Sequence, residues 1–245
     1  MADFPEMPAS GTEVANPVGG KRLRAHVIAA ALPHVPFDGW TDKTLALAIA
    51  EAGVDPALAR FEFARGGLDL LLAYHRARDR DFAERLAALD LEGLRFRDKV
   101  AVAIDTRLDV VAGEKDAVRR GVALLALPRH APEGALALWH TADAIWTALG
   151  DTSDDFNWYS KRATLSAIYS SALLYWLGED EPGFPRTRAF TRRRIEDLMR
   201  FEKAKARIGA NPVARAVLSG PLRLLGRVRA PAAPPRRDLP GWYAD

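Results

Sequence analysis

The chain of 245 residues contains no cysteine, which excludes disulfide bonds and thiolate metal sites. It has no run of apolar residues close to the roughly 18 that a membrane-spanning helix needs. Its first twenty residues lack the basic start and apolar stretch of a signal peptide. We therefore expect a soluble intracellular protein, or one that lies on a membrane surface.

Motifs of several enzyme classes are also missing. No histidine lies three residues after a glutamate, so the paired Glu-x-x-His motif of di-iron helical bundles is absent. The His-Glu-x-x-His motif, the Gly-x-Ser-x-Gly elbow and the phosphate-binding Gly-Lys-Ser/Thr loop are absent too. The sequence therefore predicts a protein without catalytic residues, metal or cofactor.

Positive charge is concentrated near the C-terminus. The net charge is only +3, but residues 186–229 contain 13 Lys or Arg and 3 acids. Residues 1–185 contain 20 bases and 27 acids, a net charge of −7. This asymmetry indicates an anionic partner for the C-terminal part, either lipid head groups or nucleic acid.

Apolar residues recur with helical spacing along most of the chain, and no alternating strand pattern of useful length occurs. We expect an all-α bundle of about ten helices, with Thr41 and Asp55 as N-caps and Pro56 in the first turn after Asp55. The expected divisions are an arm (1–19), an N-terminal module (20–75), a larger bundle (76–209), an amphipathic helix (210–230) and a Pro-rich tail (231–245). The expected helices cover about 21–32, 39–53, 54–63, 67–89, 96–111, 114–127, 134–149, 156–177, 186–208 and 212–228.

Two short helices joined by "AGVD" form a helix-turn-helix, with one helix before them and a long helix after. This arrangement resembles the N-terminal module of TetR-type regulators, on the residues Thr44, Ile49, Ala50, Ala52, Gly53 and Val54. Residues 41–64 carry two cations and four acids, a net charge of −2. Because phosphate neutralisation supplies most non-specific DNA affinity, we expect no operator binding. A TetR-type, ligand-responsive transcriptional regulator stays the alternative function.

Residues 134–149 and 156–177 are rich in Trp, Leu, Ile and Ala. Such segments suit either tight packing of large against small side chains or a cavity with aromatic walls that binds a hydrophobic ligand. The candidates for this wall are Trp139, His140, Trp146, Ile168, Tyr169, Leu173 and Trp176.

The stretch "DDFNWYSKR" (154–162) places aromatic and charged side chains at an expected helix start. Asp154 or Asp155 can cap this helix, and the spacing of Trp158, Tyr159 and Arg162 brings all three to its first turn. Trp, Tyr and Arg are the residues most enriched in interface hot spots. The alternatives are a partner-binding patch and a folded-in turn with a structural ion pair.

The segment "PVARAVLSGPLRLLGRV" (212–228) has an apolar face flanked by arginines. Such a helix can lie in a membrane interface, and the alternative is a last core helix packed on the bundle. Gly220-Pro221 would bend or interrupt it. The candidate membrane-binding residues are Val213, Arg215, Val217, Leu222, Arg223, Leu224, Leu225, Arg227 and Val228.

Residues 151–177 resemble the signature region of the Coq-nine family of ubiquinone-biosynthesis proteins. "FARGGLDLLLAYH" (63–75) resembles another region of that family, in which Gly-Gly precedes a long helix. The resemblance extends over about residues 20–230. The matching signature residues are Asp151, Ser153, Asp155, Asn157, Trp158, Tyr159, Ser160, Lys161, Arg162, Leu165, Ile168 and Tyr169.

The resemblance implies a TetR-like fold that does not regulate DNA and that forms a homodimer. It implies an isoprenoid quinone or phospholipid ligand in the larger bundle and a C-terminal helix on an anionic membrane surface. It further implies that Trp158, Tyr159 and Arg162 touch the di-iron demethoxyubiquinone hydroxylase, which the protein assists. The implied location is the inner face of the membrane, on the cytoplasmic side, or on the matrix side of a mitochondrion.

Overall fold

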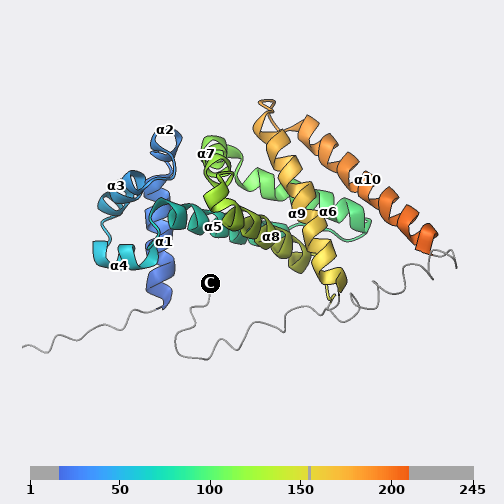
Figure 1. Cartoon of the computed structure of the whole chain (residues 1–245), viewed down its shortest axis with the longest axis horizontal. Coiled ribbons are helices and arrows are strands. Elements are labelled where there is room, and N and C mark those ends of the chain that lie inside the picture. The colour runs from blue at the N-terminus through green and yellow to red at the C-terminus, as the bar shows by residue number, and fades with distance from the viewer. Residues whose placement is uncertain (1–16, 154–155, 210–245) are drawn as a thin grey trace, which may run out of the picture.

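The computed structural model describes residues 17–153 and 156–209, and within these ranges it contains ten α-helices, two short 3₁₀ helices and no strand (Figure 1). This confirms the all-α fold that the helical periodicity predicts. The helices are α1 (Pro17–Ala31), α2 (Val35–Asp38), α3 (Asp42–Ala52), α4 (Pro56–Glu62), α5 (Gly67–Ala87), α6 (Phe96–Val110), α7 (Lys115–Leu125), α8 (Ala131–Ala148), α9 (Phe156–Leu177) and α10 (Pro185–Gly209).

Both predicted N-caps of the helix-turn-helix are confirmed. The Thr41 hydroxyl accepts a hydrogen bond from the backbone N–H of Thr44 at 3.2 Å. The Asp55 carboxylate accepts one from the backbone N–H of Ala57 at 2.7 Å, and Pro56 occupies the first position of α4. These bonds satisfy N–H groups that have no partner within the helix, so the caps set where α3 and α4 begin.

The apolar periodicity of the sequence does not predict three short elements, which are α2 and the 3₁₀ turns at Ala112–Glu114 and Pro128–His130. Each is too short to show a repeating apolar face. In addition, α8 begins at Ala131 rather than near residue 134, because Pro132 is tolerated in a first helical turn. The predicted helix over 212–228 and the predicted caps Asp154 and Asp155 lie outside the described residues.

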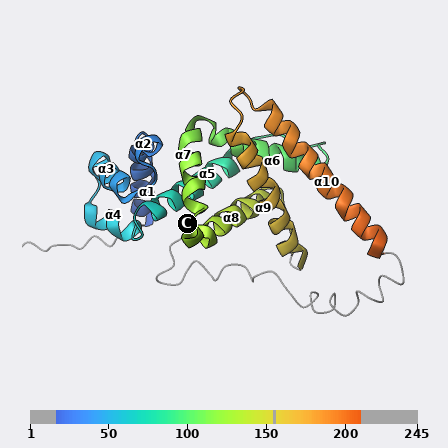
Figure 2. The same cartoon turned by 45° about the horizontal axis from the view of Figure 1, so that its top comes forward.

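The long helix α5 joins two groups of helices. Helices α1 to α4 lie together at one end of the molecule, and α5 extends from them into the bundle of α6 to α10 (Figures 1 and 2). It contacts α1 and α3 near its beginning, and α6 and α8 further along. Helix α10 packs across α9 and α6. The helix-turn-helix is therefore fixed to the bundle through one continuous helix.

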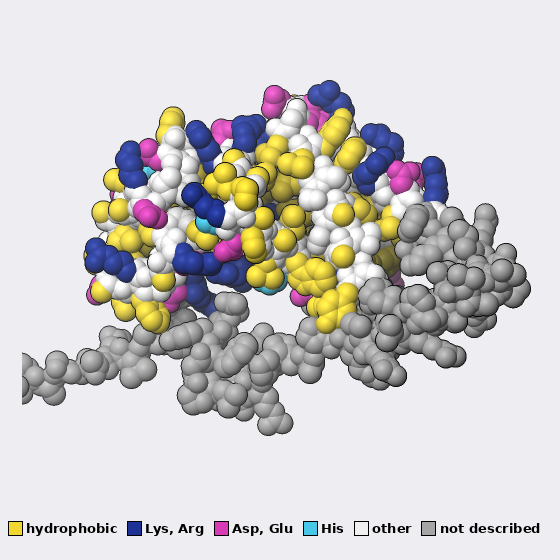
Figure 3. Space-filling view, in the orientation of Figure 1, with side chains coloured by type: hydrophobic (Ala, Val, Ile, Leu, Met, Phe, Trp, Pro, Cys, Tyr) yellow, Lys and Arg dark blue, Asp and Glu magenta, His cyan; other side chains and the backbone are white. Residues whose placement is uncertain are grey.

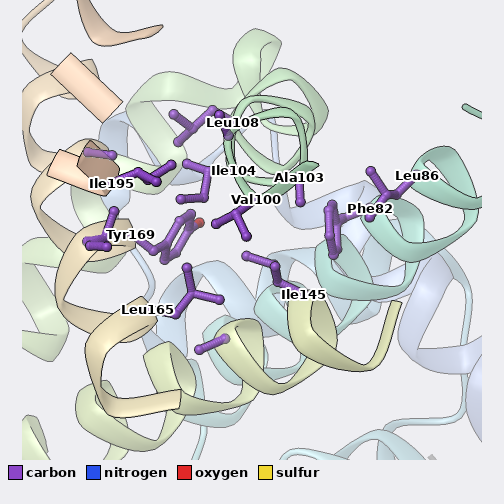
Figure 4. Packing of buried hydrophobic residues seen from close by; sticks show 14 of the residues in the cluster. Phe82, Leu86, Val100, Ala103, Ile104, Leu108, Ile145, Leu165, Tyr169 and Ile195 are labelled. Atoms are coloured by element: carbon purple, nitrogen blue, oxygen red, sulfur yellow. The ribbon is translucent and has the colours of Figure 1, made fainter. Parts of the chain in front are cut away.

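Each group has its own hydrophobic cluster. The N-terminal cluster is built on Val27, Trp40 and Leu70, and it reaches α7 through Ala117. The Trp40 indole N–H donates a hydrogen bond to the Ala117 carbonyl at 2.9 Å, which ties this module to α7. The bundle cluster draws on α5, α6, α8, α9 and α10, and its side chains interdigitate (Figure 4).

The start of α5 presses against the backbone of the preceding module. A Cβ atom at Gly67 would lie 2.4 Å from the Trp40 carbonyl oxygen, which belongs to the backbone and cannot rotate away. The Gly67 N–H also donates to the Asp42 carboxylate at 2.9 Å. Glycine at this position therefore permits the close approach of α5 to the Trp40 segment.

We predict that Gly67→Ala lowers the free energy of unfolding by about 2–3 kcal/mol, because overpacking against backbone forces the segments apart. Gly113→Ala is the matched control, since a Cβ atom there meets nothing within 4 Å. Chemical denaturation followed by far-ultraviolet circular dichroism measures both variants. Equal midpoints for the two would contradict the close-approach argument.

Candidate functional site

A cavity of about 360 Å³ opens between α5, α6, α7, α8 and α9. Its wall is mostly apolar, with leucine, valine and alanine side chains from these five helices. Ala131, Ala135 and Leu174 line it and are exposed, whereas Arg107 and Tyr169 line it and are buried. The cavity therefore has an apolar mouth at solvent and a deep end that carries polar groups.

A buried ion pair lies at this deep end. The guanidinium Nε of Arg107 on α6 donates to Asp79 on α5 at 2.8 Å, and both residues are buried. The Thr141 hydroxyl on α8 donates to the same carboxylate at 3.0 Å. His75 places its Nε2 2.9 Å from that hydroxyl oxygen and 3.5 Å from the carboxylate. One polar network thus joins three helices of the bundle.

The environment sets the charge of each group in this network. Burial lowers the pKa of His75 and outweighs the nearby Asp79 carboxylate, so the imidazole is neutral at pH 7. Burial alone would lower the pKa of Arg107, but Tyr169 and Asp79 outweigh it and raise that pKa, so the guanidinium stays charged. Burial also raises the pKa of Tyr169, which keeps its hydroxyl protonated.

The aromatic candidates from the sequence fall into different places. Tyr169 and Leu173 line the cavity. Trp146 and Ile168 line another cavity of about 290 Å³ beside α10, and His140 lines one of about 310 Å³ between α5 and α8. Trp176 is fully buried in the bundle core, whereas Trp139 packs against other aromatic rings. The apolar periodicity that selected these residues does not distinguish walls from core.

The sequence pattern does not indicate Arg107, Asp79 or His75 as site residues. The sequence does contain a sign of these buried charges. In "AYHRARD" and "IDTRLDV", charged side chains occupy positions on the helix face that the apolar pattern directs inward. Which of the many charged residues in these stretches are buried, and against which partner, depends on how α5, α6 and α8 pack.

The predicted patch at the start of α9 forms an aromatic cluster with the end of α8. Trp158 and Tyr159 are half-buried and meet edge to face, with ring centroids 4.8 Å apart. Trp139 lies 5.6 Å from Trp158 across the α8–α9 contact. Apolar side chains show at the surface near these two helix ends (Figure 3).

Arg162 lies beneath this cluster and not at its surface. Its side chain is 3% exposed, and its guanidinium carbon lies 4.0 Å from the centre of the Trp158 ring. It pairs with Asp143 at 2.5 Å and with Asp151 at 3.1 Å. A buried guanidinium paired with two carboxylates holds the ring of Trp158 in a fixed orientation.

Among the described residues, no group of three or more His, Asp or Glu side chains could hold a metal ion. Within the same ranges, no helix is long and apolar enough to cross a bilayer. Two features of the described residues bear on function: the apolar cavity with its polar end and the aromatic cluster.

The model of the COQ9 family matches residues 131–202, a range that holds α8, α9 and much of α10. "Ubiquinone biosynthesis protein COQ9, mitochondrial" from Homo sapiens is 30% identical over 186 residues, which cover 73% of this chain. The chain belongs to the COQ9 family. This confirms the resemblance that the residues of 151–177 indicate.

Other proteins named COQ9 are similar to this chain at nearly the same level of identity. The Drosophila melanogaster protein of that name is 30% identical over 74% of this chain, and the probable COQ9 protein of Dictyostelium discoideum is 28% identical over 75%. The chain spans 58% of the human protein and 56% of the Drosophila protein.

A TetR transcriptional regulator from Nitrosomonas europaea superposes with a TM-score of 0.56 at 16% identity, over 71% of this chain and 97% of that one. This COQ9 homologue therefore has a TetR-like fold.

We predict that Arg162→Met destabilises this COQ9 homologue by about 3–5 kcal/mol, because it leaves the buried Asp151 carboxylate without its guanidinium. Lys161→Met is the control, since Lys161 binds the same carboxylate at 2.7 Å but is 37% exposed and should cost about 1 kcal/mol or less. Thermal unfolding at pH 7 compares the two.

The contacts of Asp151 also predict that the stability difference between wild type and Arg162→Met depends on pH. Burial would raise the pKa of Asp151, but hydrogen bonds from Lys161, Ser153 and Arg162 outweigh burial and lower that pKa. A lowered pKa stabilises the fold above the ordinary carboxyl pKa of about 4, and this contribution is lost as the pH falls through the lowered value. The stability difference between wild type and Arg162→Met should therefore shrink below about pH 4. A constant difference down to pH 2 would contradict the assignment of Asp151.

Proposed function

We propose that this protein is a non-catalytic accessory protein of ubiquinone biosynthesis that binds isoprenoid quinone intermediates. The observation that carries the proposal is the apolar cavity, two of whose walls, α8 and α9, lie in the range that matches the COQ9 family. The assignment to ubiquinone biosynthesis comes from the names of the relatives. At the deep end Arg107 and Thr141 both donate to Asp79, and an internally paired set of this kind suits a binding role better than a catalytic one.

The size and chemistry of the cavity support a lipid ligand. About 360 Å³ lies within the range of small-molecule sites, and an apolar wall favours a hydrocarbon chain through the hydrophobic effect. A long isoprenoid tail exceeds this volume, and the mouth at Ala131 and Ala135 offers it a path to the surface. A phospholipid is the competing ligand.

We predict that Val122→Trp abolishes co-purification of lipid, because the half-buried Val122 lines the cavity and an indole there would fill it. Ala123→Trp adds the same side chain on the exposed side of α7 and should leave the bound lipid unchanged. Native mass spectrometry followed by lipid extraction measures occupancy, and circular dichroism verifies folding. Equal lipid content in the two folded variants would refute the cavity assignment.

We further propose that the aromatic cluster holds a partner protein, the di-iron demethoxyubiquinone hydroxylase. Trp158 and Tyr159 are partly exposed, and half-exposed aromatic side chains on a rigid support are typical hot spots. Arg162 then acts as a positioning residue, since its buried guanidinium supports Trp158 from below. The partner would contact the rings and not the guanidinium.

We predict that Tyr159→Ala or Trp158→Ala weakens binding of the hydroxylase by about 2 kcal/mol, which is roughly thirtyfold, with little change in melting temperature. Tyr175→Ala is the control, because Tyr175 is an exposed tyrosine near the other end of α9. Surface plasmon resonance and thermal unfolding are measured together. A large loss of stability with binding retained by the folded fraction would make these residues ordinary core.

The membrane-binding segment 210–230 lies outside the described residues, so its role stays a proposal from its sequence. We propose that it binds an anionic membrane surface at the inner face of the membrane, on the cytoplasmic or matrix side. Deletion of 211–229 removes four arginines, each worth about 1 kcal/mol near an anionic surface. Co-sedimentation with anionic vesicles should fall on deletion and on addition of salt. Unchanged sedimentation would assign the segment to the bundle.

A TetR-type transcriptional regulator is the alternative, and the TetR-like fold is what favours it. The helix in the reading position, α4, carries Arg60 as its cation and exposes Leu58 and Phe61. Arg24, which could reach a phosphate, is paired with Glu62 at 2.7 Å. We propose that this module does not bind DNA, and salt-sensitive retardation of a DNA fragment would overturn that.

Homodimerisation, which the fold implies, is tested by sedimentation equilibrium.

A further inference from the structure

We propose that the helix-turn-helix module carries a second membrane contact, in which the outer face of α4 enters the surface of an anionic bilayer and the start of α1 provides the attracting charge. This inference rests on the membrane location proposed above and adds a contact outside segment 210–230. It assigns a lipid surface to the helix that reads DNA in helix-turn-helix regulators.

Helix α4 exposes apolar side chains on its outer face. Its inner face is set by Ala59 and by Phe63, which directly follows the helix, and both are buried. Phe61 is 71% exposed and Leu58 is 49% exposed, and Ala57 beside them is exposed too. A surface helix ordinarily carries polar residues on the side away from the core. An apolar patch in that place is typical of a surface that a partner covers.

The start of α1 lies against α4 and carries positive charge. Arg24 pairs with Glu62 of α4 at 2.7 Å, and the exposed Lys21 and Arg22 belong to the same turn of α1 as Arg24. Lys21 and Arg22 make no ion pair with a described residue, and neither does the exposed Arg60 of α4. Three cations beside the apolar face are therefore available to an anionic partner.

The acidic character of residues 41–64 does not describe the charge on this face. The Glu62 carboxylate is matched by Arg24, and the Asp55 carboxylate accepts a hydrogen bond from the backbone N–H of Ala57. With the Asp55 cap included, α1 and α4 contain four Lys or Arg and two acids, a net charge of +2. Most of this charge comes from α1, and anionic lipid head groups attract such a surface.

The chemistry of the face favours a bilayer over DNA. Base edges are read by polar side chains that donate and accept hydrogen bonds, whereas the outer face of α4 presents Phe61 and Leu58. Apolar side chains flanked by cations are what an interfacial membrane anchor needs. Hydrophobic and basic side chains appear together at this end of the molecule (Figure 3).

The position of α4 in the fold supports the same partner. Helix α4, the start of α1 and the end of α10 lie along one edge of the molecule in both views (Figures 1 and 2). Helix α10 ends at Gly209, and segment 210–230 follows it in the sequence. A bilayer bound by that segment would therefore face the edge on which α4 lies.

The absence of cysteine allows a direct test with a single fluorescent label. Ala57→Cys places one thiol on the outer face of α4, and Ala123→Cys places one on the exposed side of α7 as the matched control. Each labelled full chain carries a nitrobenzoxadiazole dye and is mixed with vesicles of equal parts phosphatidylcholine and phosphatidylglycerol. We expect the dye on α4 to shift to the blue and to be quenched by nitroxide-labelled lipid, while the dye on α7 stays unchanged.

A second measurement assigns the contact to the apolar side chains. Leu58→Ser with Phe61→Ser should lower the affinity of the full chain for these vesicles at least about tenfold, because burial of two such side chains is worth that much or more. Phe37→Ser with Leu89→Ser is the matched control, since these residues are 83% and 43% exposed and lie outside α4. Circular dichroism verifies that both pairs fold.

The charge of α1 is tested in the same assay. Lys21→Gln with Arg22→Gln should weaken vesicle binding roughly fivefold per cation at low salt. Arg80→Gln with Arg85→Gln on α5 changes the net charge equally and should leave the affinity nearly unchanged, because both arginines are exposed outside this face.

The outcomes separate this inference from the membrane role of segment 210–230. An unchanged dye on α4 while the full chain binds vesicles, or equal losses in the test and control pairs, overturns the α4 contact and leaves segment 210–230 as the membrane-binding part. A dye response to the hydroxylase or to DNA in the absence of lipid overturns it in favour of that partner. Failure of the wild-type chain to bind vesicles overturns both proposals. If the paired serine variant does not fold, the dye on α4 alone decides.

Discussion

The buried ion pair between Asp79 and Arg107 is the constraint to which the rest of the bundle conforms. Two charges in an apolar interior are tolerable only when they meet each other and satisfy their remaining hydrogen bonds. Asp79 comes from α5, Arg107 from α6, and Thr141 of α8 completes the carboxylate shell. Any sliding of one helix along another would break this set, so the pair fixes the relative position of three helices. The cavity is the space left beside it.

The aromatic cluster at the start of α9 is built in a similar way. Arg162 is buried and paired with Asp143 and Asp151, and Trp158 rests on its guanidinium. Beside the cavity and beneath the aromatic cluster alike, a buried network of charged side chains fixes the position of an apolar wall or an aromatic ring. Tyr159 and Tyr169 lie ten residues apart on α9, which is about 15 Å along a helix. The proposed ligand site and the proposed docking face therefore share one rigid element, close enough for a bound lipid to be presented to a partner.

The helix-turn-helix has a structural place in this arrangement. Trp40 binds the Ala117 carbonyl on α7, and Arg120 of the same helix donates to the Pro36 carbonyl at 2.9 Å. The module thus braces α7, one wall of the cavity. The module keeps its TetR-like fold, while its α4 helix carries one cation, Arg60, and one acid, Glu62, and so has no net positive charge for DNA phosphates to attract.

Periodicity and capping chemistry in the sequence alone determine the all-α fold, the helix-turn-helix and most helix bounds, because both are local properties of the chain. Thr41 and Asp55 cap helices wherever those helices later pack. The family is likewise determined by sequence, through the contiguous residues of 151–177. By contrast, only the tertiary structure decides that Trp176 is core while Tyr169 is wall, since both occupy the same apolar face of α9. It also decides that Arg162 is buried and that Arg107 meets Asp79 from 28 residues away. Burial and pairing depend on which helices become neighbours, and no local pattern carries that information.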